Sequence, residues 1–222
     1  MSKPFSTADL SDQMDRDMTW RLREFSDMKA AIRGADMIAR PTLLRAFIAI
    51  MYAHWEGHVR HCATKYFQYI ALRKRPYTQL QTQFYLNSFI VRLDAFFRSR
   101  AGVEEKCRFM EDVLSSKDKR FAWINPDLID TKSNLNTDVL RDLCRICGIP
   151  FAEFQKEERF INELLLGRRN KIAHGEEIYP GESEIDSLVD RLVNIMRLFR
   201  NLLENKVYDL SYLVESEVPR VS

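Results

Sequence analysis

The fold is decided by residues 41–73, "PTLLRAFIAIMYAHWEGHVRHCATKYFQYIALR", the longest regular pattern in the chain. Apolar side chains recur there at steps of three and four residues, which places them on one face of an α-helix. They are Leu44, Phe47, Ile48, Met51, Trp55, Val59, Cys62, Tyr66 and Ile70. Pro41 suits the start of such a helix, and Pro76 disfavours helical geometry at Arg75. The pattern therefore predicts one long amphipathic helix over residues 41–73.

The rest of the chain carries the same helical spacing, interrupted by residues that end helices. The pattern predicts further helices over residues 12–33, 78–97, 103–115, 138–147, 153–173 and 183–206. Thr137 and Ser183 are good N-cap residues, and Gly148 is a good C-terminal stop. Between residues 121 and 136, Asn, Pro and Asp favour turns. No run of alternating apolar and polar residues predicts a strand.

These patterns together predict an all-α helical bundle of about six to seven helices. The length suits a single domain over residues 1–222, although the irregular middle could instead separate two sub-bundles. The core of the bundle is expected at about residues 40–205. An N-terminal helix at 12–33 and a C-terminal tail at 207–222 would flank it.

The composition is that of a globular protein without an overall basic field. Hydrophobic residues make up 45% and charged residues 30% of the chain, so large-scale disorder is not expected. The formal net charge is +2, which gives no general attraction for nucleic acid. Four dispersed cysteines suit a reducing compartment, where Cys144 and Cys147 would serve as small apolar residues. No signal-peptide core and no membrane span are predicted, so we expect a cytoplasmic protein.

Three histidines share one face of the predicted long helix. His54, His58 and His61 are spaced so that their imidazoles lie beside the apolar stripe. Such a group can bind a metal, but no Asp, Glu or Cys on the same face completes a ligand set. We therefore favour a polar or interface face over a metal site. Glu56 lies off this face, and an ion pair with Arg60 four residues later would satisfy it.

A second stretch, "LLLGRRNKIAHGEE" at residues 164–177, combines basic residues with the fourth histidine. On local physics it is a helix C-terminus, with basic side chains that suit the helix dipole and Gly175 just past the cap. The same residues also suit cleavage of RNA without a metal. Histidine can remove or supply a proton near neutral pH, and arginine can bind two phosphate oxygens at once. Arg169 and His174 are therefore candidate catalytic residues.

Helix geometry makes one copy of this motif a poor catalytic site. Arg169 and His174 are five positions apart, which is roughly 140° around an ideal helix, whereas Asn170 and His174 would lie side by side. Two chains packed across a twofold axis could bring two such pairs into one cleft, so that one histidine acts as base and the other as acid. The chemistry therefore predicts a homodimer that uses no metal and no cofactor. No glycine-rich phosphate loop or zinc-protease motif competes with this hypothesis.

These residues resemble the HEPN superfamily (higher eukaryotes and prokaryotes nucleotide-binding), whose hallmark is an arginine followed by four to six residues and a histidine. "RNKIAHGE" matches this motif with Arg169 and His174, and Arg168 also falls within the allowed spacing. The blocks "LRAFIAIMYAHWEGHVR", "SNLNTDVLRDLC" and "RRNKIAHGE" are similar, in this order, to those of a bacterial HEPN subfamily. The resemblance covers about residues 40–205.

The resemblance implies a dimeric helical bundle that acts on RNA. In active members it implies metal-independent RNA cleavage, often in toxin–antitoxin or phage-defence systems. Carried over to this sequence, Arg169 would stabilise the phosphate and His174 would be the acid/base, while Asn170 is the polar residue that commonly follows the arginine. Weaker candidates for supporting roles are Arg168, Lys171 and Glu56.

The sequence departs from one pattern of the superfamily. Toxins paired with a nucleotidyltransferase antitoxin often carry a tyrosine two residues after the histidine, and that tyrosine is modified. Glu176 stands at this position, and Tyr179 is off the motif. An antitoxin protein is still an expected partner, but regulation through that tyrosine is not expected. Because some HEPN domains only bind, the alternative function is a non-catalytic module for RNA, nucleotide or a partner protein.

Overall fold

A computed structural model describes residues 2–99, 101–178 and 180–215 of the chain. Over these residues it is all-α, as predicted, with two isolated bridges and no strand. Its seven α-helices are α1 (Thr7–Gly34), α2 (Ala39–Leu72), α3 (Thr82–Arg98), α4 (Val103–Ser115), α5 (Thr137–Cys147), α6 (Arg168–Ala173) and α7 (Glu182–Tyr208). Short 3-10 helices lie at Tyr77–Gln79, Pro126–Ile129 and Ala152–Glu157, and a π-helix lies at Phe160–Gly167. None of the helices in this part of the chain combines the length and apolarity needed to cross a membrane.

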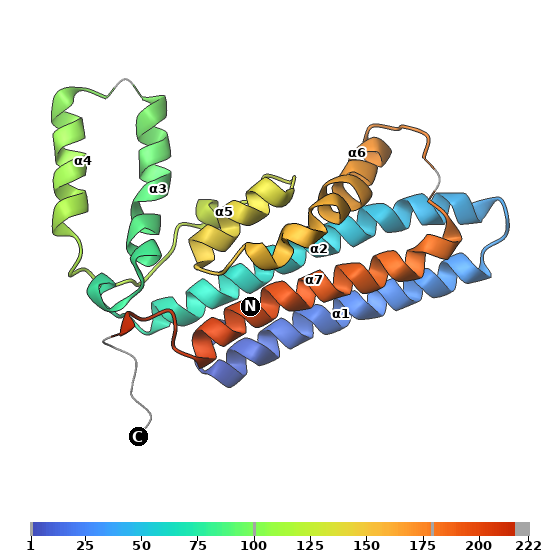
Figure 1. Ribbon diagram of the computed structural model, residues 1–222, viewed down its shortest axis with the longest axis horizontal. Coiled ribbons are helices and arrows are strands. Elements are labelled where there is room, and N and C mark those ends of the chain that lie inside the picture. The colour runs from blue at the N-terminus through green and yellow to red at the C-terminus, as the bar shows by residue number, and fades with distance from the viewer. Residues whose placement is uncertain (1, 100, 179, 216–222) are drawn as a thin grey trace.

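The three longest helices, α1, α2 and α7, lie side by side and form the body of the molecule (Figure 1). All nine residues of the apolar stripe predicted for α2 are buried. Tyr52, Ala63 and Phe67, which lie on other faces of α2, are buried as well. They are covered because α6 and the 3-10 helix Pro126–Ile129 pack on α2 from the side opposite to α1 and α7. α2 is therefore buried on more than one face and packs against most of the other core helices.

α1 begins at Thr7 rather than at residue 12, because Ser6 and Asp9 form a capping box. The Ser6 hydroxyl accepts the backbone N–H of Asp9, and the Asp9 carboxylate accepts the backbone N–H of Ser6, both at 3.0 Å. Farther along α1, Met18 and Phe25 belong to the same hydrophobic core as the stripe of α2. The first helix is therefore packed on the body along its length.

The prediction of one α-helix over residues 153–173 is wrong. The chain forms a 3-10 helix, then the π-helix Phe160–Gly167, and only then α6. In the π-helix the buried residues recur five apart, as Phe160 with Leu165 and Ile161 with Leu166. Such pairs share a face when the backbone hydrogen bonds run from i to i+5.

Two predicted N-caps are each shifted by one or two residues. Asn136, rather than Thr137, caps α5 with its side chain, and Gly181, rather than Ser183, precedes α7. Gly148 ends α5 as predicted, with a φ of 72° that favours glycine. The helices themselves are where the apolar spacing predicts them, because their buried faces decide their existence more than their caps do.

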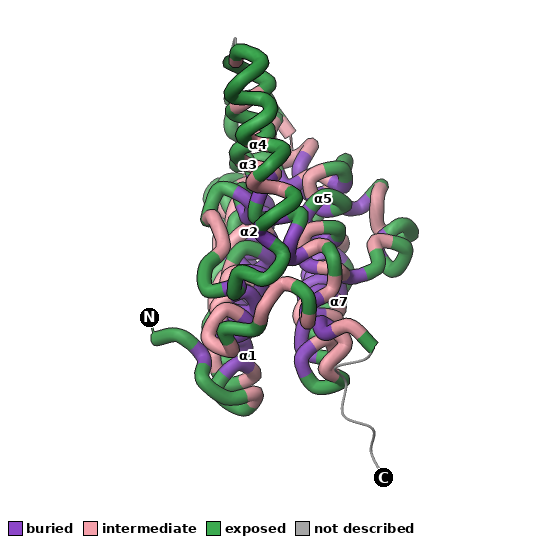
Figure 2. The backbone as a smooth tube through the Cα atoms, turned by 90° about the vertical axis from the view of Figure 1, so that its left-hand side faces the viewer, coloured by how far each residue is buried: buried purple, intermediate pink, exposed green. Residues whose placement is uncertain are grey.

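α3 and α4 form a hairpin that projects from the body (Figure 1), and Figure 2 shows that most of its surface is exposed. Large apolar side chains remain in solvent there, among them Phe97 and Met110. The segment after α7 behaves differently, since Tyr212 and Leu213 are buried and Leu213 bridges to Leu80. Residues 209–213 therefore pack on the body next to the start of α3.

Candidate functional site

Arg169 lies in α6, and its side chain reaches across to α2. The guanidinium carbon lies 4.0 Å from the centre of the Tyr52 ring, in a cation–π contact. Its Nη2 donates a hydrogen bond to the carbonyl oxygen of Ser133 at 2.6 Å. The Nε is buried without a hydrogen-bond partner among the described residues. The guanidinium is thus held between an aromatic face and a backbone carbonyl.

The Ser133 carbonyl is presented by a tight turn of unusual backbone. Lys132 and Ser133 have φ angles of 54° and 49°, a region that few residues other than glycine adopt. The Asn134 N–H closes the turn on the Thr131 carbonyl at 2.9 Å, and the Asp130 carboxylate accepts the Lys132 N–H at 2.8 Å. Positive φ at both central residues is the pattern of a type I′ turn. This turn holds the Ser133 carbonyl where the Arg169 guanidinium meets it.

Glu56 and Tyr52 are four residues apart on α2, and both form hydrogen bonds with the segment that contains the Lys132–Ser133 turn. The Thr131 hydroxyl donates to the Glu56 carboxylate, and the Tyr52 hydroxyl accepts the Leu135 N–H at 2.6 Å. Burial raises the pKa of Tyr52, so its hydroxyl stays protonated near neutral pH. Glu56 therefore acts on Arg169 through Thr131 and the turn.

The ion pair predicted between Glu56 and Arg60 is wrong. Arg60 instead donates to the Thr131 hydroxyl at 3.2 Å, and its Nη2 lies 3.8 Å from the Asp130 carboxylate. Both α2 side chains turn toward the segment that follows the 3-10 helix, because that segment lies directly against this face of α2. Spacing within α2 does not show that a segment 75 residues later in the chain supplies the partner of Glu56.

His174 is the C-cap residue of α6 and is exposed. Gly175 follows it with a φ of 77°, as predicted for the residue after the cap. The Gly175 N–H bonds to the Ile172 carbonyl and the Glu176 N–H to the Lys171 carbonyl, the two hydrogen bonds of a Schellman motif. This motif fixes the backbone on which the imidazole is carried.

The segment after His174 is tied to α2, as Arg169 is. Arg45 in α2 donates a hydrogen bond to the carbonyl oxygen of Glu176 at 3.1 Å. Arg45 and Tyr52 lie two turns apart along α2. Arg169 and the backbone two residues after His174 are therefore bound to the same half of α2. In the described part of the chain, however, no hydrogen bond joins the Arg169 and His174 side chains.

The other predicted site residues have separate local roles. Arg168 donates to the Glu184 carboxylate in the first turn of α7 at 3.0 Å, so its charge is partly neutralised. The Asn170 carbonyl accepts the His174 N–H at 2.9 Å, and Lys171 is exposed. Of the two arginines within the motif spacing, Arg169 is thus the one on the α2 side. Tyr179 lies outside the described residues.

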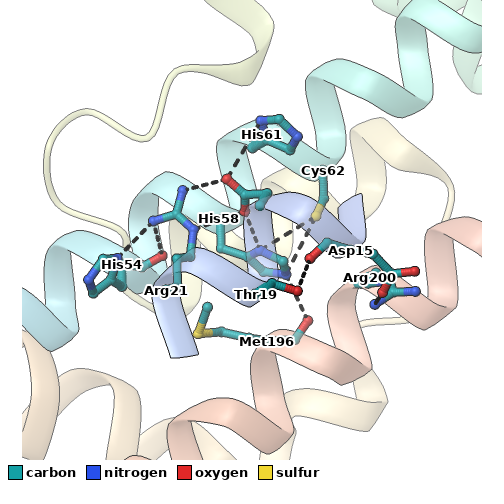
Figure 3. Close-up of polar contacts among 10 residues, drawn as sticks. Asp15, Thr19, Arg21, His54, His58, His61, Cys62, Met196 and Arg200 are labelled. Atoms are coloured by element: carbon teal, nitrogen blue, oxygen red, sulfur yellow. Dashed lines mark hydrogen bonds and ion pairs between the residues drawn. The ribbon is translucent and has the colours of Figure 1, made fainter. Parts of the chain in front are cut away.

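The three histidines of α2 are packed against α1 (Figure 3). His58 Nδ1 lies 2.7 Å from Asp17 Oδ2, and His61 Nδ1 lies 3.7 Å from Asp17 Oδ1. His54 Nδ1 lies 3.1 Å from Arg21 Nη1. Asp17 also accepts two hydrogen bonds from Arg21, at 2.9 Å each. The predicted polar or interface face is thus the interface between α1 and α2. These five residues, of which His61 is partly exposed and the other four are buried, form a group that we call the Asp17 cluster.

The Asp17 cluster contains a cationic side chain at its centre. Arg21 passes so close to Gly57 that a Cβ there would lie 3.0 Å from Arg21 Nη1, which explains the glycine in the "HWEG" block. Among the described residues, no three His, Cys, Asp or Glu side chains are arranged to hold a metal ion. Beyond Asp17 and Arg21, His54 Nε2 lies 2.6 Å from the Glu24 carboxylate, and His58 Nε2 lies 3.2 Å from the Met196 carbonyl oxygen. The imidazoles of His54 and His58 are therefore held by protein groups on both ring nitrogens.

The Asp17 cluster predicts that the fold loses stability in mild acid. Burial lowers the pKa of His54 and of His61 from the ordinary 6.5, so the native state keeps them neutral below that pH. The unfolded chain binds these protons first, and its free energy falls relative to the native state. We therefore expect the urea midpoint at about pH 5.5 to be lower than that at about pH 7.5.

A His61→Gln variant provides the control for this prediction. Glutamine keeps a polar side chain but does not titrate, so the loss of stability between the two pH values should become smaller. An unchanged pH dependence in this variant would contradict the role of His61.

Sequence reasoning missed Tyr52, Thr131 and Ser133 as site residues. Tyr52 lies in "YAHWEG" and Ser133 begins "SNLN", and both stretches belong to the blocks that resemble a HEPN subfamily. The resemblance assigned neither residue a role. Nothing in the local pattern says that the Ser133 carbonyl meets a side chain 36 residues later in the chain.

The comparisons with known proteins gave one match. The model of a protein family described as RiboL-PSP-HEPN matches residues 16–205, which includes most of α1, the turn at Ser133 and the Arg169 motif. The search of curated proteins and the search of solved structures found no match. The match extends farther toward the N-terminus than the blocks quoted from the sequence.

Proposed function

Since the chain belongs to the RiboL-PSP-HEPN family, we propose that it is an endoribonuclease that acts as a homodimer and uses no metal. Family membership supports an RNA- or nucleotide-related function. One observation carries the finer proposal: the Arg169 guanidinium is fixed on Tyr52 and Ser133, next to a helix end that exposes His174. An arginine fixed in this way loses little rotamer entropy when it binds a phosphate.

The proposed reaction is internal attack on the phosphodiester. The 2′-oxygen forms a bond to phosphorus, the bond from phosphorus to the 5′-oxygen breaks, and the products are a 2′,3′-cyclic phosphate and a 5′-hydroxyl. One His174 imidazole takes the 2′-proton, and a second gives a proton to the 5′-oxygen. Arg169 donates to the non-bridging oxygens, where negative charge increases in the transition state.

The need for two proton transfers supports the homodimer. Each chain supplies one histidine in the motif, and that histidine is exposed at the end of α6, where a second chain can approach it. A twofold axis near this helix end would place two His174 residues and two Arg169 residues around one phosphate. Asn170, in the same turn of α6, would line that cleft, with Arg168, Lys171 and Glu56 in supporting positions.

The biological setting is also a proposal. Toxin–antitoxin and phage-defence systems in the cytoplasm are consistent with the HEPN resemblance, and an antitoxin protein is a proposed partner. Glu176 stands where a modified tyrosine would be in some HEPN toxins. Its carbonyl is bonded to Arg45 and its N–H to Lys171, so this position contributes to the helix end. We therefore propose control by protein binding and not by modification of that position.

The proposal is tested by incubating the purified protein with mixed RNAs in excess chelator. We expect cleavage that persists without divalent metal and leaves cyclic phosphate ends. A 2′-deoxy nucleotide at the cleaved position should block the reaction, because the attacking oxygen is removed. Loss of all cleavage in chelator would contradict the metal-free mechanism. Binding of RNA without cleavage in any condition would favour the alternative, a non-catalytic binding module.

A further inference from the structure

A second feature of the same face of α2 is a groove of about 590 Å³ near its C-terminal end. The groove lies between α2 and the segment from Ala122 to Asp130. Phe67 and Ile129 contribute buried apolar surface, and the Trp123 ring stands at the rim. The volume is within the range of pockets that hold small organic ligands.

Trp123 is unusual because it is a large aromatic ring left in solvent. It is 67% exposed although apolar neighbours on both sides of the segment are packed. An exposed indole beside a groove offers a flat surface on which a nucleobase can stack. Gln68 also lines the groove, and its side-chain oxygen has no hydrogen-bond partner among the described residues.

Charged groups around the groove suit a nucleotide. Lys3, Arg60 and Lys74 line it and are exposed, so they can approach phosphate oxygens. The carboxylates of Asp127 and Asp130 also line it and can accept hydrogen bonds from the amino groups of a base. An aromatic surface, cations and a few acceptors together describe a site for single-stranded RNA.

The groove is connected to the Arg169 site by one continuous segment. Phe121 begins the segment with its N–H on the Arg75 carbonyl at 2.8 Å, and Leu135 ends it with its N–H on Tyr52. Between these points Thr131 bonds to α2 through Glu56. The segment therefore runs antiparallel along α2, with Trp123 near one end and the turn at Ser133 near the other.

The distance between the two sites fits one strand of RNA. Tyr52, under Arg169, and Phe67, in the groove, are fifteen residues apart on α2, which is about 22 Å along the helix. A single strand that has its scissile phosphate at Arg169 needs only a few nucleotides to reach the groove. Arg60 lies between them on the same face.

We propose that this groove binds a nucleotide of the single-stranded RNA substrate, a few positions from the scissile phosphate. Trp123 stacks on the base, and Lys74 binds the adjacent phosphate. The inference rests on the proposed function, because it takes the RNA bound at Arg169 as the strand that reaches the groove. A partner protein is the competing occupant of this groove, and it is favoured if Trp123→Ala leaves the RNA affinity unchanged.

The test measures binding of a short, unstructured, fluorescein-labelled RNA by anisotropy in a His174→Ala background, where cleavage does not interfere. Trp123→Ala should raise the Kd at least about fivefold, since each stacked base contributes measurable affinity. Lys74→Asn should reduce the slope of log Kd against the logarithm of the salt concentration by about 0.7, the value for one phosphate contact on a single strand. Asparagine is chosen because Lys74 has a φ of 48°, which asparagine tolerates.

Phe97→Ala is the matched control. Phe97 is an aromatic side chain with 79% exposure on the α3–α4 hairpin, outside the groove, so its loss should leave the Kd unchanged. Unlabelled mononucleotides provide a second control. Displacement of the RNA by micromolar mononucleotide would make the groove a site for free nucleotides and would overturn the assignment to the RNA strand.

The outcomes separate this inference from the proposed function. Suppose that the wild type cleaves RNA, but that adding Trp123→Ala to the His174→Ala parent does not change the Kd for RNA. Then the groove is not an RNA site and the nuclease proposal stands. If Trp123→Ala weakens binding while the wild type cleaves no RNA, the groove stands and the nuclease proposal falls. If the parent binds no RNA, the groove assignment is wrong.

Discussion

Replacing His174 by alanine is expected to lower the rate of RNA cleavage by about 10²–10⁴-fold, the usual contribution of a positioned acid or base. The expected loss is large because, in the proposed dimer, one substitution removes both the base and the acid. His174 is exposed at the end of α6, so its side chain contributes little to the core and the variant should fold. The rate is measured on a defined RNA in excess chelator.

Arg169 provides a second test of the same site. Arg169→Ala should lower the cleavage rate by about 10²–10³-fold, as for loss of a donor to the transition state. Arg169→Lys should not restore it, because lysine cannot bind Tyr52 and two phosphate oxygens with one planar group. Arg159→Ala is the matched control, since Arg159 is an exposed arginine paired with Glu163 outside the motif. Equal rates for wild type and His174→Ala would show that the catalytic assignment is wrong.

The largest expected effect on stability comes from Asp17→Ala, which should lower the free energy of unfolding by about 3–5 kcal/mol. Burial acts to raise the pKa of Asp17, but the hydrogen bonds from His58 and Arg21 outweigh it and hold that pKa well below its ordinary value. The carboxylate is therefore ionised in the folded protein. Removing it leaves Arg21, a residue that is only 6% exposed, without the carboxylate with which it pairs. Urea denaturation at neutral pH measures the change.

Asp12→Ala is the matched control for Asp17→Ala. Asp12 is on the same helix and also pairs with an arginine four residues later, Arg16, but both side chains are largely exposed. Exposed pairs contribute little, so this variant should have nearly wild-type stability. A similar small effect for Asp17→Ala would show that the Asp17 cluster does not hold α1 on α2. The loss should also appear in the His174→Ala background, because the two sites share no residue.

The Asp17 cluster and the Arg169 site occupy different faces of α2. Tyr52 and His54 are two positions apart, which is about 200° around the helix, and they face α6 and α1 respectively. α2 therefore binds α1 through the Asp17 cluster on one face and contacts Arg169 through Tyr52 on another. Neither role can be assigned to a residue of α2 until the neighbouring helices are placed.

The sequence by itself determined the elements whose physics is local. The stripe from Leu44 to Ile70 specified α2, because residues three and four apart share a helix face wherever the helix lies. Gly148 and Gly175 marked two helix ends, because positive φ favours glycine regardless of tertiary contacts. The spacing of Arg169 and His174 identified the candidate motif for the same reason: it is contained within one short stretch.

Tertiary structure alone decided which distant groups these residues meet. Asp17 reaches His58 across 41 positions of the chain, and Ser133 reaches Arg169 across 36. Neither contact follows from spacing within a helix, so the sequence predicted only a polar or interface face for the histidines and paired Glu56 with Arg60. The interruption of the helix before Arg169 was also hidden, because the apolar pattern of "FINELLLG" is equally compatible with an α-helix, and the structure forms a π-helix there. Local periodicity fixes which residues share a helix face, whereas packing between helices fixes what that face meets.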